Sequence, residues 1–245
     1  MNRRWIFGVV LLFLGSVLAG YAGINFVVWK VDSERTNEAI TELKKIAITE
    51  ENGDQSAFSV SEKMTVNFSE LLRQNNDTVA WVEFLSTEVS YPVVQTSDNE
   101  FYLRHSFDKR GNSAGWVFMD YRNRADFSDF NTIFYAHGRL DNTMFGSLNE
   151  AYKNKKFSRG QKIQVYTARE NFEYEIISVY LTAPTDDYIK TNFSDEKEKK
   201  TFINMILGRD ELGLTSSATE EDEILTLSTC YDSSRRLVVH AKKVI

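Results

Sequence analysis

An uncharged run near the N-terminus constrains this chain more than any other feature. Residues 5–29, WIFGVVLLFLGSVLAGYAGINFVVW, contain no charged side chain, and only Ser16 and Asn25 are clearly polar. About 20 apolar residues are enough to cross a bilayer as a helix, so this run is long enough to span one. Because Arg3 and Arg4 precede it, the positive-inside rule places the short N-terminus in the cytoplasm and everything after residue 30 outside.

A cleaved signal peptide is the alternative interpretation of the same run, with Val17 and Ala19 as small residues before a cut. The apolar residues continue past that position to Trp29, which favours an uncleaved anchor. We therefore predict three segments. Residues 1–30 form a cytoplasmic tip and transmembrane signal-anchor, residues 31–75 a juxtamembrane helical segment, and residues 76–245 an extracellular folded domain.

The pattern of the chain changes from helix to strand after residue 76. Eight short segments are rich in β-branched and aromatic residues. They are residues 78–85, 89–95, 115–120, 131–137, 161–168, 172–181, 223–229 and 236–244. Only one or two helices are expected between them, over residues 143–154 and 195–207. This order indicates a mainly β fold and a closed or nearly closed barrel, rather than alternating β-α-β units.

Helical patterns precede the predicted barrel. Residues 31–48 space Ile40, Leu43 and Ala47 at helical intervals, and residues 67–75 add a helical turn or two. The polar stretch over residues 49–63 is loop-like.

The charge balance and the metal-binding residue types exclude some functions. Acidic residues outnumber basic ones by 35 to 29, which gives no support to nucleic-acid binding. Three scattered histidines and one cysteine show no metal-ligand spacing. The acidic stretches 185–187 and 220–223 are interpreted as solvated faces, so we predict no metal and no cofactor.

The single cysteine, Cys230, follows the strand expected over residues 223–229. It cannot form an internal disulfide, and an unpaired thiol is unusual in an exported protein. Strand alternation places it on one face with Thr226 and Ser228, away from the leucines that should enter the core. A free cysteine is usually a packing residue. The strand end and the hydroxyl neighbours favour a nucleophile here, which requires a nearby base or cation.

Three histidines are available to act as that base. His105 lies in a polar turn, where a solvated or structural role is expected, and His240 lies inside the last strand, where a hydrogen-bonded structural role is expected. His137 ends an apolar strand and precedes Gly138. Because barrels expose working side chains where strands open into loops, we favour His137.

Two arginines at the start of the last strand are candidates to stabilise charge. Attack of a thiol on an amide develops negative charge on the carbonyl oxygen, and a fixed guanidinium suits that charge. Alternation groups Arg235 with Leu237 on the core face and leaves Arg236 on the outward face. A short loop between the two strands would bring Arg236 to the same rim as Cys230.

Several motifs resemble the sortase family, class B in particular. TLSTC followed by RLVVHAK, with YAHG and MFGSL upstream, is similar to the family pattern. The segment YPVVQTSDNEFYLRHSFDKRGNSAGWVFMD resembles the class B sequence between a YPV strand and a strand ending in aspartate. The resemblance runs from about Trp81 to the C-terminus. It implies a closed eight-stranded sortase-type β-barrel with N-terminal helices and an inserted helix before the cysteine strand.

The same resemblance implies the site and the reaction. His137, Cys230 and Arg236 would form the catalytic set, with Ser228 and Thr229 shaping the substrate groove. The protein would be a cysteine transpeptidase in the cell membrane of a Gram-positive cell, with its catalytic domain outside. It would cleave an NPxT-like C-terminal sorting signal of secreted proteins through a thioester. The amine acceptor would be a peptidoglycan precursor or a pilin lysine.

Two alternatives belong to other classes. An L,D-transpeptidase also uses cysteine and histidine outside the membrane, but places a His-Gly pair close to a Ser-x-Gly-Cys motif. Here no glycine precedes Cys230, and His137 lies far from it in sequence. A non-catalytic module that only binds surface proteins is the other alternative, and the reactivity of the Cys230 thiol would discriminate it from an enzyme.

Overall fold

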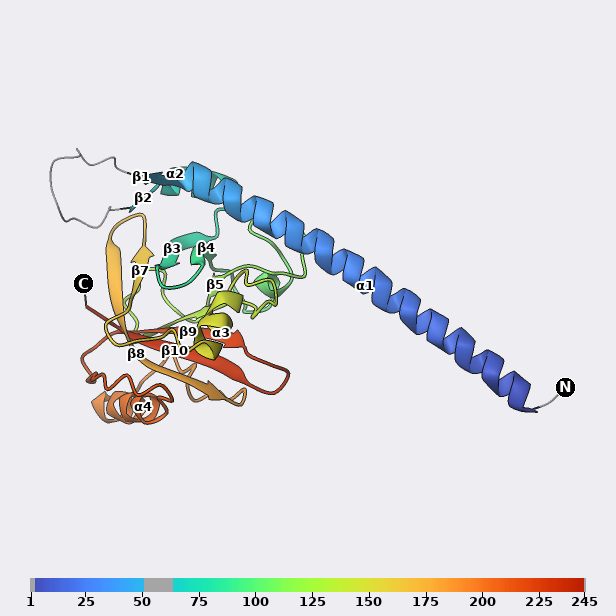
Figure 1. The fold of residues 1–245 in the computed structure, drawn as a ribbon. Coiled ribbons are helices and arrows are strands. Elements are labelled where there is room, and N and C mark those ends of the chain that lie inside the picture. Colours follow the sequence, from blue (N-terminus) through green and yellow to red (C-terminus); the bar gives the residue numbers. More distant parts are fainter. Residues whose placement is uncertain (1–2, 51–63, 245) are drawn as a thin grey trace.

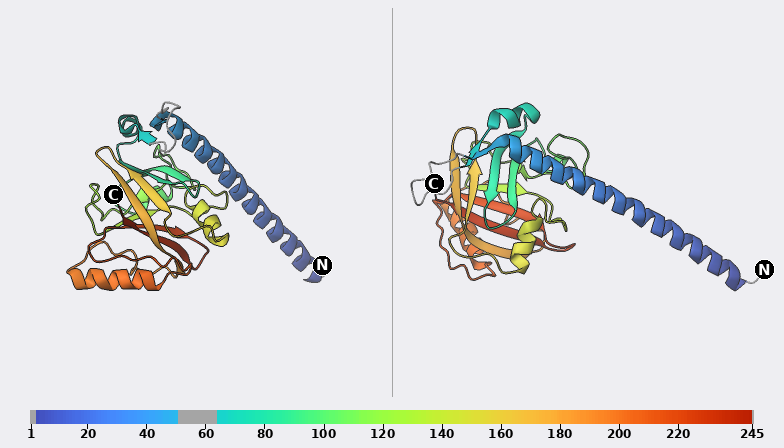
Figure 2. Two further views of the ribbon diagram at one scale, coloured as in Figure 1. Left: turned by 60° about the vertical axis from the view of Figure 1, so that its left-hand side comes forward. Right: turned by 45° about the horizontal axis from the view of Figure 1, so that its top comes forward.

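One helix, α1, runs without a break from Arg3 to Ala47 in the computed structural model, which describes residues 3–50 and 64–244. Its N-terminal part stands clear of the rest of the molecule, and its C-terminal part packs along the folded domain (Figure 1, Figure 2). Residues 10–47 include an apolar stretch of 18 residues, none of it buried, that is long enough to cross a membrane. The two segments that the sequence predicts on either side of residue 30 are thus one helix, because no proline or glycine separates them.

Eight strands close the predicted barrel. They are β3 (Thr78–Phe84), β4 (Val89–Val94), β5 (Phe118–Met119), β6 (Asn131–Tyr135), β7 (Lys162–Tyr166), β8 (Asn171–Thr182), β9 (Ile224–Cys230) and β10 (Arg236–Lys243). The order around the barrel is β10-β8-β7-β3-β4-β5-β6-β9, and β9 pairs with β10 to close it. The pairs β4–β5 and β6–β9 are parallel. The mainly β, closed eight-stranded fold is confirmed.

Two details of the strand prediction are wrong. The strand expected over residues 115–120 pairs only at Phe118 and Met119, because Gly115 has a φ of +60° and the Trp116 amide donates to the carbonyl of Tyr102. A further strand pair was not expected: β1 (Ile48–Glu50), which begins the stretch predicted to be a loop, pairs with β2 (Met64–Val66), which follows that stretch. Three-residue strands show too little alternation to be recognised. Residues 51–63 of that stretch lie outside the described residues.

Three of the remaining helices follow the sequence, namely α2 (Phe68–Gln74), α3 (Gly146–Lys153) and α4 (Glu196–Gly208), and the short 3-10 helix η1 (Phe101–Leu103) was not predicted. The inserted helix α4 lies between β8 and β9, as predicted. The Asp195 side chain caps its first turn, as aspartate commonly does. Its apolar side packs on the outer face of the barrel, with Phe202 and Ile206 against Ile177 and Ile224.

The two faces of β9 differ in what covers them. Leu225 and Leu227 enter the main core inside the barrel. The opposite face, which carries Thr226 and Ser228, is also buried, because α4 and the segment that precedes it lie over this side of the sheet. Only Cys230, at the end of the strand, is partly exposed.

Candidate active site

Three strand ends meet at one rim of the barrel. Strands β6 and β9 are parallel, with Tyr135 opposite Ser228, so both end on the same side. Strand β10 begins there, because Arg236 is the register partner of Cys230. The residues that follow β6 include His137. The rim is therefore formed by segments that lie about a hundred residues apart in sequence.

A pocket of about 430 Å³ opens at this rim. Its lining includes all five residues that the sequence analysis singles out, namely His137, Ser228, Thr229, Cys230 and Arg236. It also includes residues that the sequence analysis missed: Asn99, Leu103, Phe118, Tyr135, Ala136, Pro184, Thr185, Asp186, Tyr188 and Ile189. Most of the missed residues come from two connections, β4 to β5 and β8 to α4, where no periodic pattern marks an inward-facing side chain.

Close backbone packing fixes the position of Cys230. The Asn149 side chain, on α3, donates a hydrogen bond from Nδ2 to the Cys230 carbonyl oxygen at 2.9 Å. A Cβ atom added to Gly138 would lie 2.0 Å from that same oxygen, so only glycine fits beside the cysteine backbone. The residue after His137 therefore has no side chain because the two chain segments touch there. No local sequence pattern marks Asn149 for this role.

One ring nitrogen of His137 forms a hydrogen bond. Its Nε2 lies 2.8 Å from the carbonyl oxygen of Leu103. A carbonyl only accepts, so Nε2 carries the proton and donates it. In the neutral ring this leaves Nδ1 unprotonated. Nδ1 is thus the nitrogen that can take up or release a proton in the pocket.

The two arginines differ in their partners. Arg235 forms an ion pair with Asp232 at 2.7 Å, and hydrogen bonds from the Arg235 guanidinium hold the pKa of Asp232 well below its usual range. The Arg235 guanidinium also lies 5.2 Å from the centre of the Tyr231 ring. Arg236 forms no ion pair with any described residue and lines the pocket beside Cys230. The geometry favours Arg236 as the cation available to a substrate.

The hydroxyls of Ser228 and Thr229 have protein partners. Thr229 Oγ1 donates to the carbonyl oxygen of Ala136 at 2.8 Å and ties β9 to the segment that carries His137. Ser228 Oγ lies 3.2 Å from the hydroxyl of the buried Tyr188. Burial raises the pKa of Tyr188, while Ser228 and the nearby Arg236 guanidinium act in the opposite direction. Both hydroxyls therefore support the wall of the pocket, and a role in shaping the groove stays a prediction.

The other two histidines have structural surroundings. The His105 ring stacks on Phe101, with ring centres 4.0 Å apart, and its Nδ1 lies 2.6 Å from the Phe101 carbonyl oxygen. His240 is fully buried. Its Nε2 lies 2.9 Å from the Tyr180 hydroxyl and its Nδ1 lies 2.9 Å from Thr226 Oγ1. Neither ring lines the pocket at the rim.

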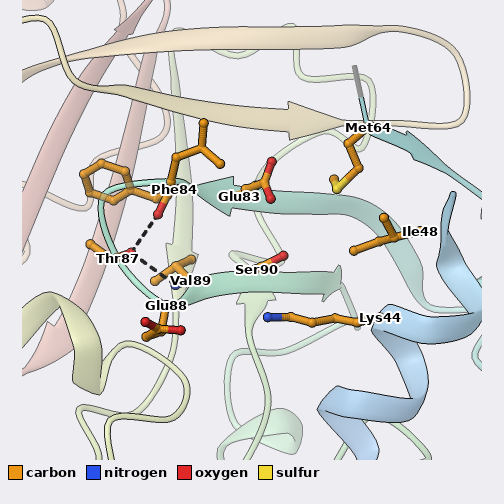
Figure 3. A pocket seen from close by; sticks show the side chains of 10 residues that line it. Lys44, Ile48, Met64, Glu83, Phe84, Thr87, Glu88, Val89 and Ser90 are labelled. Atoms are coloured by element: carbon orange, nitrogen blue, oxygen red, sulfur yellow. Dashed lines mark hydrogen bonds between the residues drawn. The ribbon is translucent and has the colours of Figure 1, made fainter. Parts of the chain in front are cut away.

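A second groove lies between the β3–β4 hairpin and the C-terminal end of α1 (Figure 3). Lys44 and Glu88 approach it from opposite sides, and Glu83 and Ser90 come from the paired strands. Burial raises the pKa of Glu83, partly offset by a hydrogen bond from Tyr166. None of the residues that the sequence analysis singles out lines this groove, so we place the candidate active site at the rim.

Comparison with known proteins identifies the family. The sequence model of the sortase domain matches residues 82–244. The chain is 31% identical to sortase B of Listeria monocytogenes over 226 residues, which cover 88% of this chain and 90% of the relative. The crystal structure of sortase B from Bacillus anthracis superposes with a TM-score of 0.73 at 33% identity, covering 86% of this chain and 96% of that one. A sortase B complexed with triglycine gives a TM-score of 0.66 at 31% identity over 72% and 85% of the two chains. The chain therefore belongs to the sortase family and resembles its class B members throughout the barrel, as an enzyme that cleaves sorting signals by cysteine transpeptidation.

Proposed function

We propose that Cys230 is the nucleophile of this transpeptidase, that His137 is its general acid and base, and that Arg236 stabilises the oxyanion. One observation carries the assignment: the pocket at the rim is lined by the chain's single thiol, by an imidazole and by a guanidinium that has no carboxylate partner among the described residues. A thiol, a proton carrier and a fixed cation are the groups that acyl transfer needs.

The first half of the reaction forms a thioester. The Cys230 thiol passes its proton to Nδ1 of His137, and the resulting thiolate attacks the carbonyl carbon of the scissile amide. The Arg236 guanidinium balances the negative charge that develops on the carbonyl oxygen. His137 gives a proton to the departing amine as the C–N bond breaks. The acyl group of the substrate is then bound to sulfur.

The second half returns the enzyme to its starting state. An acceptor amine attacks the thioester carbonyl, and His137 removes the proton that the amine loses. The C–S bond breaks, and Cys230 leaves as a thiolate. The His137 ring donates a proton to the departing amine in the first half of the reaction and accepts one from the attacking amine in the second. A single histidine therefore serves both halves. The Leu103 carbonyl supports this role by holding Nε2 and leaving Nδ1 to carry the proton.

The substrates that suit this enzyme are secreted proteins with a C-terminal NPxT-like sorting signal. The acceptor is an amine of a peptidoglycan precursor or of a pilin lysine. The triglycine complex of the sortase B relative supports a small, unhindered amine. The apolar N-terminal part of α1 would anchor the chain once in the cell membrane, with the barrel outside and the N-terminus in the cytoplasm.

The rival functions find less support. An L,D-transpeptidase would need its histidine and cysteine motifs close in sequence, and family membership does not favour it. A module that only binds would not need a reactive thiol. A methanethiosulfonate reagent discriminates such a module from an enzyme, because a nucleophile at a pocket rim reacts and loses activity, whereas a packing cysteine stays unmodified.

A cleavage assay on the full-length chain in detergent micelles tests the proposal. Fluorogenic peptides that vary around NPxT are incubated with and without glycine peptides as acceptors. We expect cleavage, transfer to the acceptor, and a thioester that mass spectrometry detects on Cys230. The Cys230→Ala variant should lose both cleavage and transfer while its circular dichroism and melting temperature match those of the unaltered chain. Retained cleavage by that variant would refute the assignment of the nucleophile.

A further inference from the structure

The loop that follows His137 packs against α1 where the apolar run ends. The Arg139 guanidinium lies 5.6 Å from the centre of the Trp29 ring, and it also donates to the Ser33 hydroxyl. A second loop joins this contact, because Asp32 accepts hydrogen bonds from the backbone and side chain of Ser113. The segment of α1 just after the uncharged run is thus fixed to the rim of the domain.

The length of the uncharged run sets the depth of Trp29 in a bilayer. At about 1.5 Å of rise per residue, the run is about 37 Å long, whereas a hydrocarbon core is about 30 Å thick. Its last residue, Trp29, therefore falls in the interface, where tryptophan is enriched. Lys30 follows directly and is exposed. A side chain that contacts Trp29 therefore lies at the same depth in the interface.

The tip of this loop presents one apolar side chain to the outside. Leu140 is 91% exposed. The charges on either side of it turn inward and neutralise each other, because Arg139 and Asp141 form an ion pair at 2.8 Å with side chains only 6% and 16% exposed. An apolar residue with paired charges beside it enters an interface at little electrostatic cost.

We propose that the loop over residues 139–142 rests on the outer surface of the membrane, with Leu140 inserted at the boundary between lipid headgroups and acyl chains. The partner of this surface is a lipid bilayer, and the inference depends on the proposed anchoring by α1. Gly138 alone separates this loop from His137. The contact therefore holds one wall of the pocket at the membrane surface, and a substrate reaches the pocket along that surface.

Depth-dependent fluorescence quenching tests this proposal on the full-length chain. Single cysteines are introduced at three exposed leucines in the Cys230→Ala background, labelled with an environment-sensitive nitrobenzoxadiazole dye, and reconstituted into vesicles of phosphatidylcholine and phosphatidylglycerol. The variants are Leu140→Cys at the loop, Leu18→Cys inside the apolar run and Leu85→Cys as the control. Leu85 is 76% exposed and lines the groove beside Lys44. Lys44 lies about 22 Å further along α1 than Trp29.

The three labels separate the possible outcomes. We expect nitroxides on the headgroups to remove most of the emission at position 140, nitroxides in the middle of the acyl chains to do so at position 18, and neither to affect position 85. Quenching at position 18 without quenching at position 140 overturns the inference and leaves the anchor intact. Absence of quenching at position 18 overturns the proposed anchoring and the inference with it. Equal quenching at positions 140 and 85 overturns the inference as well, because it would mean that the folded domain has no preferred face toward the membrane.

Discussion

The pairs Cys230–Arg236 and Thr226–His240 lie on the same face of the same two strands, four residues apart along each strand. Each pair places a group that can accept a hydrogen bond, the Cys230 sulfur or the Thr226 hydroxyl, opposite a nitrogen-containing side chain, Arg236 or His240. The first lines a pocket at the open rim. The second lies beneath α4 and is fully buried. The comparison shows that solvent access, and not residue type, separates a candidate site from a structural cluster on this sheet.

The two histidines show the consequence of that difference. Both ring nitrogens of His240 have partners, and burial, assisted by the nearby Arg209 guanidinium, lowers its pKa to about 3. A ring that stays neutral and fully bonded cannot shuttle protons near neutral pH. His137 has a bond at one nitrogen only among the described residues. Of these two histidines, it is the one whose second nitrogen is available for chemistry.

Substitution of each histidine should separate activity from stability. We expect His137→Ala to lower kcat/KM for a sorting peptide by about 10²- to 10⁴-fold, the usual contribution of a general acid and base, with little change in melting temperature. His240→Gln should instead destabilise the fold by about 1–3 kcal/mol, because buried partners lose a hydrogen bond. Peptide cleavage and urea unfolding of both variants in micelles measure these effects. If His240→Gln lost activity without losing stability, the distinction drawn between the rim and the buried cluster would be wrong.

The two arginines offer a second test of the rim. Removing one donor from an oxyanion site typically lowers kcat by about 10²- to 10³-fold, and we expect Arg236→Ala to fall in that range. Arg235→Ala removes a guanidinium that already pairs with Asp232 and should leave kcat close to that of the unaltered chain. Steady-state kinetics with one peptide compares the two variants directly. If Arg235→Ala lost more kcat than Arg236→Ala, Arg235 and not Arg236 would stabilise the oxyanion.

Much of the fold was predictable from the sequence because its signals are local. The eight barrel strands show alternation or β-branched runs, and Asp195 with two glutamates marks the start of α4. Strand alternation also favoured Arg236 over Arg235, but its placement of Arg235 on the core face was wrong, because Arg235 is exposed and precedes β10. The short β1–β2 pair and the shortening of β5 were not predictable, since they depend on hydrogen bonds such as that from the Trp116 amide to Tyr102.

The surroundings of the candidate site were predictable only in part. The order of motifs indicated His137, Cys230 and Arg236, but nothing local marked Asn149 or Tyr188 as their neighbours. These two residues reach the rim from α3 and from the connection after β8, so their placement depends on tertiary packing. Burial of the Thr226 face of β9 was missed for the same reason, because its cover comes from the inserted helix.

The glycine beside His137 should be irreplaceable, unlike a glycine in open space. In Gly138→Ala the new Cβ would lie 2.0 Å from the Cys230 carbonyl oxygen, so the two segments must move apart. Displacement of reacting groups by about 1 Å can cost about 10²-fold in rate, and we expect a loss of up to that size. Gly111→Ala is the matched control, because a Cβ there meets nothing within 4 Å. Equal activity of the two variants in the peptide assay would contradict the close contact at the rim.

The buried histidine predicts the smallest effect, a dependence of the free energy of unfolding on pH. The pKa of His240 is about 3 in the folded chain and 6.5 when unfolded. Between these values the unfolded state binds a proton that the folded state does not, so stability falls as the pH drops below 6.5 and the effect ends near pH 3. The slope from this group is about 1.4 kcal/mol per pH unit.

Carboxylates titrate alike in the unaltered chain and in His240→Gln, so the difference between the unfolding free energies of these two proteins isolates the histidine. We expect that difference to shrink by about 2 kcal/mol between pH 6.5 and pH 5, measured by urea unfolding. A difference that stays constant over this range would mean that His240 accepts a proton inside the fold, and that its burial does not keep the ring neutral.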